Sequence, residues 1–124
     1  MELVMCLGSN CGDRERQLLQ ALELLRDNLL EVRWSSIYET PCALNHGKDY
    51  LNLVVSGRLE SEYEGFATLL KKYECISGRN EECRRNGDVP IDIDIVIADG
   101  EIKKEWDFRQ QFFKTGFQQL MQNC

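Results

Sequence analysis

The chain has 124 residues, of which 43% are hydrophobic and 29% charged, and its formal net charge at pH 7 is −6. This composition is typical of one globular domain, spanning residues 1–124. The sequence shows no membrane-length apolar run and no signal-like segment, and its negative charge disfavours general nucleic-acid binding. We therefore expect a cytoplasmic protein that binds neither membranes nor nucleic acid. We also expect a monomer rather than an oligomer.

The six cysteines do not indicate a disulfide framework. They lack regular spacing, they form no C-x-x-C pair, and a chain of this size can build a core without covalent links. We expect reduced thiols, with Cys6 and Cys75 buried. The single histidine, His46, has no evident partner ligands for zinc and is predicted to lie in a surface loop.

The first half of the chain is predicted to contain three strands and one helix. A short apolar strand over 2–7 ends in a turn rich in Gly, Asn and Asp. Asp13 is a suitable N-cap for a helix over 13–28. Further strands are predicted over 31–40, which a proline ends, and over 49–60.

The next segment is predicted to form a helix, a loop and a strand. Ser61 and Glu64 have the spacing of a capping box and predict a helix over 61–77. Residues 78–90 are polar and contain glycine, which is typical of a loop. Strict alternation over 91–97 predicts a strand.

After a turn at Asp99-Gly100, the tail is predicted to be helical in part, with an interruption at Gly116. The order β-α-β-β-α-β is that of the ferredoxin-like α+β fold. We expect a four-stranded antiparallel sheet with both helices on one face and with its first and last strands adjacent. The other face is expected to be open to a ligand, and an extra helical segment follows at the C-terminus.

The strand over 91–97 carries the most informative pattern. One face is a row of isoleucines, and the other face places Asp92 and Asp94 side by side, with Cβ atoms about 6–7 Å apart. Carboxylates this close repel unless a cation holds them, and Mg²⁺ prefers carboxylate oxygens together with water and phosphate. A solvent-facing strand, which needs no metal, is the alternative. The apolar row comprises Ile91, Ile93, Ile95 and Ile97.

The preceding loop adds positive charge, because it carries Arg79, Arg84 and Arg85. Metal ions can neutralise some oxygens of a polyphosphate while guanidinium groups bind others. A loop with three arginines that leads into two carboxylates is therefore suited to a nucleotide polyphosphate.

Five short motifs occur together between residue 3 and about residue 100. They are Leu7-Gly8-Ser9-Asn10 with Gly12-Asp13, Ser36-Ile37-Tyr38-Glu39-Thr40-Pro41, Asp49-Tyr50-Leu51-Asn52, Glu74 ahead of Gly78-Arg79, and Ile91-Asp92-Ile93-Asp94-Ile95. Each motif alone is weakly specific. In this order and spacing they resemble the 6-hydroxymethyl-7,8-dihydropterin pyrophosphokinase family of folate biosynthesis.

The resemblance implies that the pyrophosphoryl group of ATP moves to the hydroxymethyl oxygen of the pterin, leaving AMP. Asp92 and Asp94 match the family's aspartates that bind two Mg²⁺ ions, and Arg79 and Arg85 complete the implied catalytic set. The implied pterin-binding residues are Thr40, Pro41, Tyr50, Asn52 and Phe117, with Asn52 at the pterin edge and Phe117 stacked on its ring. The implied nucleotide-binding residues are Glu74, Arg79, Arg84 and Arg109.

The sequence departs from the family pattern at one loop and in the tail. Asn86-Gly87-Asp88-Val89 replaces a Trp-Gly-Pro-Arg segment, so one stacking ring and one catalytic arginine are missing and a negative charge is added. Arg109 aligns with a phosphate-binding histidine, and Thr115 stands where the family has a basic residue. Loss of one preorganised charge donor typically costs about 3–4 kcal/mol in the transition state.

Three hypotheses follow. The first is a working or weakened pyrophosphokinase, favoured by Asp92, Asp94 and Asn52. The second is a diverged homologue that binds a pterin or nucleotide without turnover, favoured by Asn86, Asp88 and Val89. The third is a ferredoxin-like interaction module in which the aspartate pair has no function, and it predicts no Mg²⁺-dependent ligand binding. All three are considered because a fold alone does not fix function.

Overall fold

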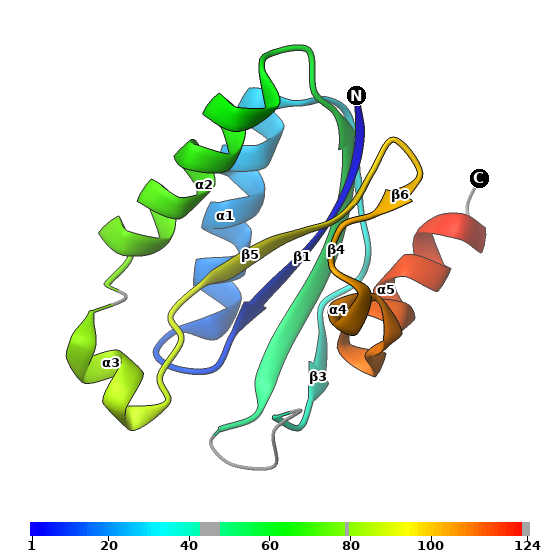
Figure 1. Ribbon diagram of the computed structural model, residues 1–124. Coiled ribbons are helices and arrows are strands. Elements are labelled where there is room, and N and C mark those ends of the chain that lie inside the picture. Colours follow the sequence, from blue (N-terminus) through cyan, green and yellow to red (C-terminus); the bar gives the residue numbers. More distant parts are fainter. Residues whose placement is uncertain (43–47, 79, 123–124) are drawn as a thin grey trace.

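A six-stranded antiparallel sheet forms the centre of the molecule (Figure 1). The computed structural model describes residues 1–42, 48–78 and 80–122. The main strand order is β2-β4-β1-β5-β6, and β3 also pairs with β4. The strands are β1 Glu2–Ser9, β2 Leu30–Trp34, β3 Tyr38–Thr40, β4 Tyr50–Arg58, β5 Asp92–Ala98 and β6 Glu101–Ile102. The α+β class and the pairing of the first strand with the 91–97 strand are confirmed, whereas the predicted number of four strands is wrong.

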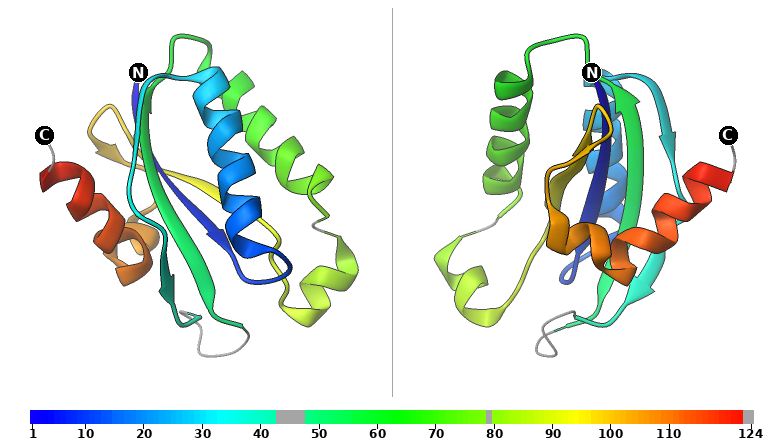
Figure 2. Two further views of the ribbon diagram at one scale, coloured as in Figure 1. Left: turned by 180° about the vertical axis from the view of Figure 1, so that it is seen from behind. Right: turned by 45° about the vertical axis from the view of Figure 1, so that its right-hand side comes forward.

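Helices lie on both faces of this sheet (Figure 2). The bounds are α1 Arg14–Asn28, α2 Tyr63–Ile76, α3 Glu81–Asn86, α4 Glu105–Arg109 and α5 Gln111–Gln122. The larger core packs α1 and α2 against one sheet face, and a smaller core packs α4 and α5 against the other. The second face is therefore partly covered by the tail rather than open. In the part of the chain that the structure describes, no helix has the length and apolar character needed to cross a membrane.

The two predicted helix starts have different outcomes. The Asp13 carboxylate accepts a hydrogen bond from the backbone N–H of Arg16 at 3.2 Å, which confirms it as the N-cap of α1. The capping box at Ser61 and Glu64 is wrong, because α2 begins at Tyr63 after an N-cap residue that makes no side-chain capping bond.

The predicted continuous strand over 31–40 is divided into β2 and β3. At the break, the Ser35 backbone N–H donates to the Val54 carbonyl at 2.9 Å, while the Ser35 hydroxyl accepts from the Val54 N–H at 3.0 Å. The side chain thus replaces the main-chain carbonyl as the acceptor, and the regular ladder is interrupted at this residue.

The predicted loop over 78–90 contains α3. The Asn80 carbonyl side chain caps this short helix by accepting from the Cys83 N–H at 2.9 Å, and Gly87 ends it in the left-handed region at φ +72°. The six-residue helix buries no side chain, so it leaves no apolar periodicity in the sequence from which a helix could be predicted.

The apolar row predicted along β5 is interrupted by one extra residue. Ile95 lies opposite Met5 and Ile97 lies opposite Val4, so Val96 has no partner of its own in the register with β1. Beyond this bulge, Ile97 joins the smaller core under α4 and α5, while Ile95 remains in the larger core. The prediction that all four isoleucines share one face is therefore wrong for Ile97.

The tail after β6 is more helical than predicted. Gly116 does not interrupt α5, which passes through it to Gln122. A Cβ atom at Gly116 would lie 2.5 Å from Val54 Cγ2 and 2.8 Å from the Tyr38 hydroxyl oxygen. The glycine thus lets α5 approach β3 and β4 more closely than any larger residue would allow.

The five cysteines that the structure describes are free thiols. Cys6 is buried, as expected, but the prediction of a buried Cys75 is wrong. It follows the buried Glu74 on α2, and one residue turns a helix by about 100°, away from the core. His46 lies outside the described residues.

Candidate active site

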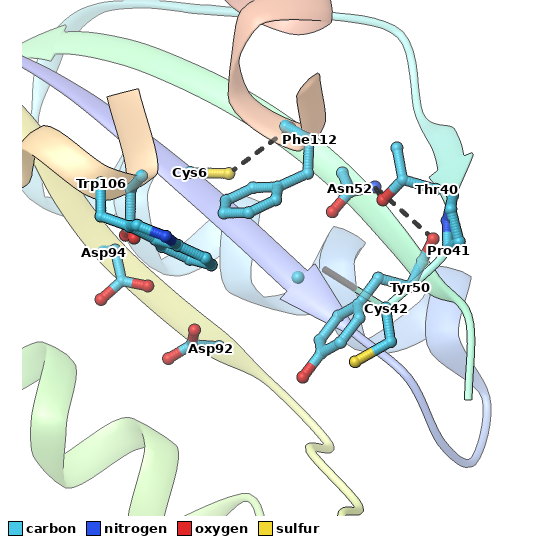
Figure 3. Close-up of a pocket in the computed structure, with 12 residues that line it drawn as sticks. Cys6, Thr40, Pro41, Cys42, Tyr50, Asn52, Asp92, Asp94, Trp106 and Phe112 are labelled. Carbon is cyan, nitrogen blue, oxygen red and sulfur yellow. Dashed lines mark hydrogen bonds between the residues drawn. The ribbon is translucent and has the colours of Figure 1, made fainter. Parts of the chain in front are cut away.

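A cleft of about 180 Å³ opens on the sheet face that carries α4 and α5 (Figure 3). Its floor is set by strand register, because Gly8 of β1 lies opposite Asn52 of β4 on one side and Asp92 of β5 on the other. A Cβ atom at Gly8 would lie 3.2 Å from the Tyr50 ring, so a glycine at this position leaves space in the cleft beside that ring. The lining residues are Cys6, Gly8, Thr40, Pro41, Cys42, Tyr50, Asn52, Asp92, Asp94, Trp106, Asp107 and Phe112.

One end of the cleft carries a fixed amide. Asn52 is only 2% exposed, and its side-chain nitrogen donates to Thr40 Oγ1 at 2.8 Å and to the Tyr38 carbonyl at 3.2 Å. These bonds fix the amide nitrogen against β3. Figure 3 shows the amide oxygen turned to the other side, toward the cleft, where it can accept a hydrogen bond from a ligand.

The other end of the cleft is acidic. Asp92 and Asp94 are both half-buried on β5, and Lys104 Nζ lies 2.5 Å from Asp94 Oδ1. Burial, followed by the negative charge of Asp92, raises the pKa of Asp94 to about 6. Burial and the charge of Asp94 also raise the pKa of Asp107, a third carboxylate of the cleft. This end therefore favours a bound cation.

Aromatic rings form the remaining walls. Figure 3 shows Trp106 and Phe112 on one side of the cleft and Tyr50 on the other. The Trp106 and Phe112 ring centroids are 6.0 Å apart, with the planes tilted by 50°. The cleft thus combines ring surfaces, an amide oxygen and a carboxylate pair, which suits a flat heterocycle joined to a charged group.

Comparison with known proteins supports the family resemblance that the sequence motifs indicated. The family model described as 7,8-dihydro-6-hydroxymethylpterin-pyrophosphokinase matches residues 4–121. The chain belongs to this pyrophosphokinase family.

Several curated relatives have corresponding names. A folate synthesis bifunctional protein of Arabidopsis thaliana is 36% identical over 98 residues, which cover 77% of this chain and 20% of that protein. A 2-amino-4-hydroxy-6-hydroxymethyldihydropteridine pyrophosphokinase of Aquifex aeolicus is 32% identical over 97 residues, covering 77% of this chain and 60% of the relative. The pyrophosphokinase of the same name from Bacillus subtilis is 34% identical over 100 residues, covering 78% and 59%. The chain thus spans about a fifth of the plant protein and about three-fifths of these two bacterial proteins.

The structure brings together six of the residues implied by the pyrophosphokinase resemblance. They come from three strands and from the turn after β3, and all line the cleft: Thr40, Pro41, Tyr50, Asn52, Asp92 and Asp94. Their roles toward ligands remain predictions, but their convergence from separate parts of the sequence is a property of the fold.

Phe117, predicted to stack on the pterin, is not among the residues that line the cleft. Its ring stacks on Phe113 with centroids 5.1 Å apart and contacts the edge of Phe108. Phe113 is fully buried in the smaller core, so Phe117 packs on the core side of α5. The rings that the tail presents to the cleft are Trp106 and Phe112.

The predicted nucleotide-binding residues that the structure describes do not line the cleft either. Arg84 and Arg85 are exposed on α3, and Arg109 is exposed and pairs with Glu105 at 3.0 Å. Glu74 is buried between α2 and the sheet. Its carboxylate accepts a hydrogen bond from the backbone N–H of Ile93 at 2.8 Å, on the sheet face away from the cleft. Arg79 lies outside the described residues.

The loop that departs from the family pattern is held by contacts of its own. Asn10 binds it three times: its amide nitrogen donates to the Gly87 carbonyl at 2.9 Å, its backbone N–H donates to the Val89 carbonyl at 3.0 Å, and its side-chain oxygen accepts from the Val89 N–H. Asp88, the added negative charge, pairs with Lys48 at 2.8 Å. The charge of Asp88 is thus compensated within the protein.

Sequence reasoning missed the other cleft residues. Cys6 could have been found by alternation, because it lies two residues before Gly8 and opposite Asp94. Cys42 could not, because it follows the end of β3. Trp106, Asp107 and Phe112 reach the cleft from the two short tail helices, whose packing has no signal in the local sequence.

Proposed function

We propose that this protein transfers the pyrophosphoryl group of ATP to 6-hydroxymethyl-7,8-dihydropterin, giving AMP. The observation that carries this proposal is the row Asn52–Gly8–Asp92 across three neighbouring strands. An amide and a carboxylate pair thus lie at opposite ends of one cleft, which supports a heterocycle at one end and a metal-bound nucleotide at the other. Family membership supports the same reaction.

At one end of the cleft, the pterin lies between Tyr50 on one side and Trp106 and Phe112 on the other. Its edge binds the amide of Asn52, which Thr40 holds in place. Fixed polar groups of this kind discriminate strongly, because a ligand without the matching donor leaves a buried acceptor unpaired.

At the acidic end, Asp92 and Asp94 bind Mg²⁺. The donor set fits the ion, since both ligands are hard oxygens, and the ammonium group already on Asp94 shows that the position attracts a cation. Among the described residues no cluster of three or more His, Cys, Asp or Glu could hold a metal, so Asp92 and Asp94 would hold the ion together with water and nucleotide oxygens. We propose two ions, which supply charge neutralisation along the triphosphate.

The protein contributes mainly position. The two carboxylates are set by the β5 backbone, and the pterin hydroxymethyl group is directed toward them by the Asn52 contact. Holding both reactants in one cleft replaces a collision with a step inside one complex. A cytoplasmic location and a monomeric state remain predictions.

The test is AMP release from ATP in the presence of Mg²⁺ and 6-hydroxymethyl-7,8-dihydropterin. Wild-type protein should release AMP only when the pterin is present, and Asp92→Asn should abolish the reaction. Asp27→Asn, on the outer side of α1, is the matched control and should retain full activity. Pterin and nucleotide binding without AMP release would favour the diverged binding homologue, and absence of Mg²⁺-dependent binding would favour the interaction module.

A further inference from the structure

Lys104 occupies a position that the backbone fixes relative to the aspartate pair. The carbonyl of Val96, the bulge residue two positions after Asp94, accepts the backbone N–H of Lys103 at 2.7 Å and that of Lys104 at 3.4 Å. The segment after β6 is thus tied to the same strand that carries the carboxylates, and the Lys104 side chain starts beside Asp94.

The Lys104 side chain binds the proposed metal ligand directly. Its Nζ atom lies 2.5 Å from Asp94 Oδ1, and the charges of Asp94, Asp107 and Asp92 all stabilise its ammonium form. The Asp94 side chain is 22% exposed, whereas that of Lys104 is 47% exposed. The carboxylate is therefore fixed in the cleft, while the flexible lysine stem retains access to solvent and room to move.

The cleft has a deficit of positive charge. The described residues that line it include Asp92, Asp94 and Asp107 but no lysine or arginine. A polyphosphate requires cationic groups in addition to its metal ions. Lys104, at the acidic rim, is the basic side chain that an ion pair already holds at this end of the cleft.

We propose that Lys104 neutralises Asp94 in the nucleotide-free protein, is displaced from it by the divalent ion, and then binds a polyphosphate oxygen of the nucleotide. The proposal rests on the proposed function, since it takes a metal-bound nucleotide as the ligand of this site. Lys104 is thus a catalytic residue whose charge moves from carboxylate to phosphate as the metal enters.

The exchange follows from the geometry. The divalent ion and the ammonium group are attracted to the same Asp94 carboxylate, and two cations at one carboxylate repel each other, so entry of the ion weakens the lysine contact. Metal binding would therefore release the Lys104 ammonium group at the acidic end of the cleft, where the nucleotide is proposed to bind and where a compact ammonium group is an effective phosphate ligand. The charge is supplied only when the nucleotide and its metal are in place.

The first test measures Mg²⁺ binding to nucleotide-free protein by calorimetry at pH 8, where Asp94 is ionised. Lys104→Met keeps the aliphatic stem and removes the competing charge, so it should bind Mg²⁺ about fivefold more tightly than wild type. Lys103→Met is the matched control, because Lys103 pairs with the exposed Glu101 and should leave the affinity unchanged. An unchanged or weaker affinity in Lys104→Met would overturn the displacement.

The second test measures affinity for ATP at saturating Mg²⁺. Lys104→Met should bind the nucleotide at least fivefold more weakly than wild type, Lys103→Met should be unchanged, and Lys104→Arg should retain most of the affinity. Equal ATP affinity in Lys104→Met and wild type would overturn the phosphate contact. Both measurements are binding experiments, so they decide the role of Lys104 even if the wild-type protein releases no AMP, which would refute the proposed function alone.

Discussion

The contact between α5 and the sheet gives a stability prediction of definite sign. In Gly116→Ala, the new Cβ atom would meet Val54 Cγ2 at 2.5 Å, Val54 Cβ at 2.7 Å and the Tyr38 hydroxyl at 2.8 Å. Val54 is completely buried in β4 and cannot retreat. To restore a carbon–carbon separation of about 3.5 Å, α5 must move away from the sheet by about 1 Å.

Such a movement has two costs. Overpacking of a close-packed interface typically destabilises by about 1–3 kcal/mol. The movement also weakens the hydrogen bonds of the Tyr38 hydroxyl, which accepts from the Gly116 N–H at 3.0 Å and donates to the Phe112 carbonyl at 2.5 Å. One such hydrogen bond contributes about 1 kcal/mol. Alanine gains about 1 kcal/mol of helix propensity over glycine. The net loss in the free energy of unfolding is therefore about 1–3 kcal/mol.

Urea denaturation followed by circular dichroism measures this difference, and Gly65→Ala provides the matched control. Gly65 lies in the first turn of α2, and an added Cβ there would meet nothing within 4 Å. That variant should therefore be stabilised by about 0.5–1 kcal/mol, because only the propensity gain applies. If Gly116→Ala were as stable as Gly65→Ala or more so, the close approach of α5 to the sheet would be refuted.

Four further predictions concern the cleft and its support. In metal-free protein, Asp92→Asn should lower the pKa of Asp94 from about 6 toward its ordinary value of 3.8, measured by carboxyl NMR titration. The folded-state pKa of Asp94 is raised, so Asp94 contributes most to the free energy of unfolding of the wild-type protein below about pH 4, and this contribution is lost as the pH rises through 6. Asp94→Asn should remove this pH dependence of stability. Trp106→Ala should weaken pterin binding about tenfold while Phe117→Ala changes it by less than threefold, and the reverse order would show that the tail rings are misassigned. Glu74→Ala should cost about 1–3 kcal/mol of unfolding free energy by leaving a buried N–H of β5 without an acceptor, whereas equal stability would show that this bond contributes nothing.

Prediction from the local sequence succeeded where a single short-range interaction decides the structure. Asp13 begins α1 because its side chain reaches an N–H three residues ahead, and Asp99-Gly100 makes the turn to β6 with φ values of +48° and +77°. Such predictions failed where a residue distant in the sequence decides the structure. The division of the 31–40 strand depends on Ser35 meeting Val54, and the rotation of Ile97 depends on an unpaired Val96.

The candidate site likewise combines features that the local sequence predicts with features that depend on distant partners. Alternation alone places Asp92 and Asp94 together on β5, and the motif ending in Asn52 marks β4. Their meeting across Gly8 depends on β-sheet register, which the separate strands do not specify. The choice between Phe112 and Phe117 depends on how α5 is rotated about its axis, and Gly116 fixes that rotation through contacts with β3 and β4.

Two small backbone features thus connect the tail to the aspartate strand. The bulge at Val96 holds the segment that places Lys104 on Asp94, and Gly116 allows the close approach that presents Phe112 to the cleft. The 86–89 loop lacks an aromatic ring and an arginine of the family pattern. The tail carries a ring pair that lines the cleft and a lysine that contacts Asp94 at its acidic end. If these tail groups perform the missing roles, a double change of Trp106→Ala with Lys104→Met should abolish AMP release in a protein that remains folded. Persistent turnover in that variant would mean that the tail groups do not replace the missing ring and arginine, and that the 86–89 loop supports the reaction despite its altered residues.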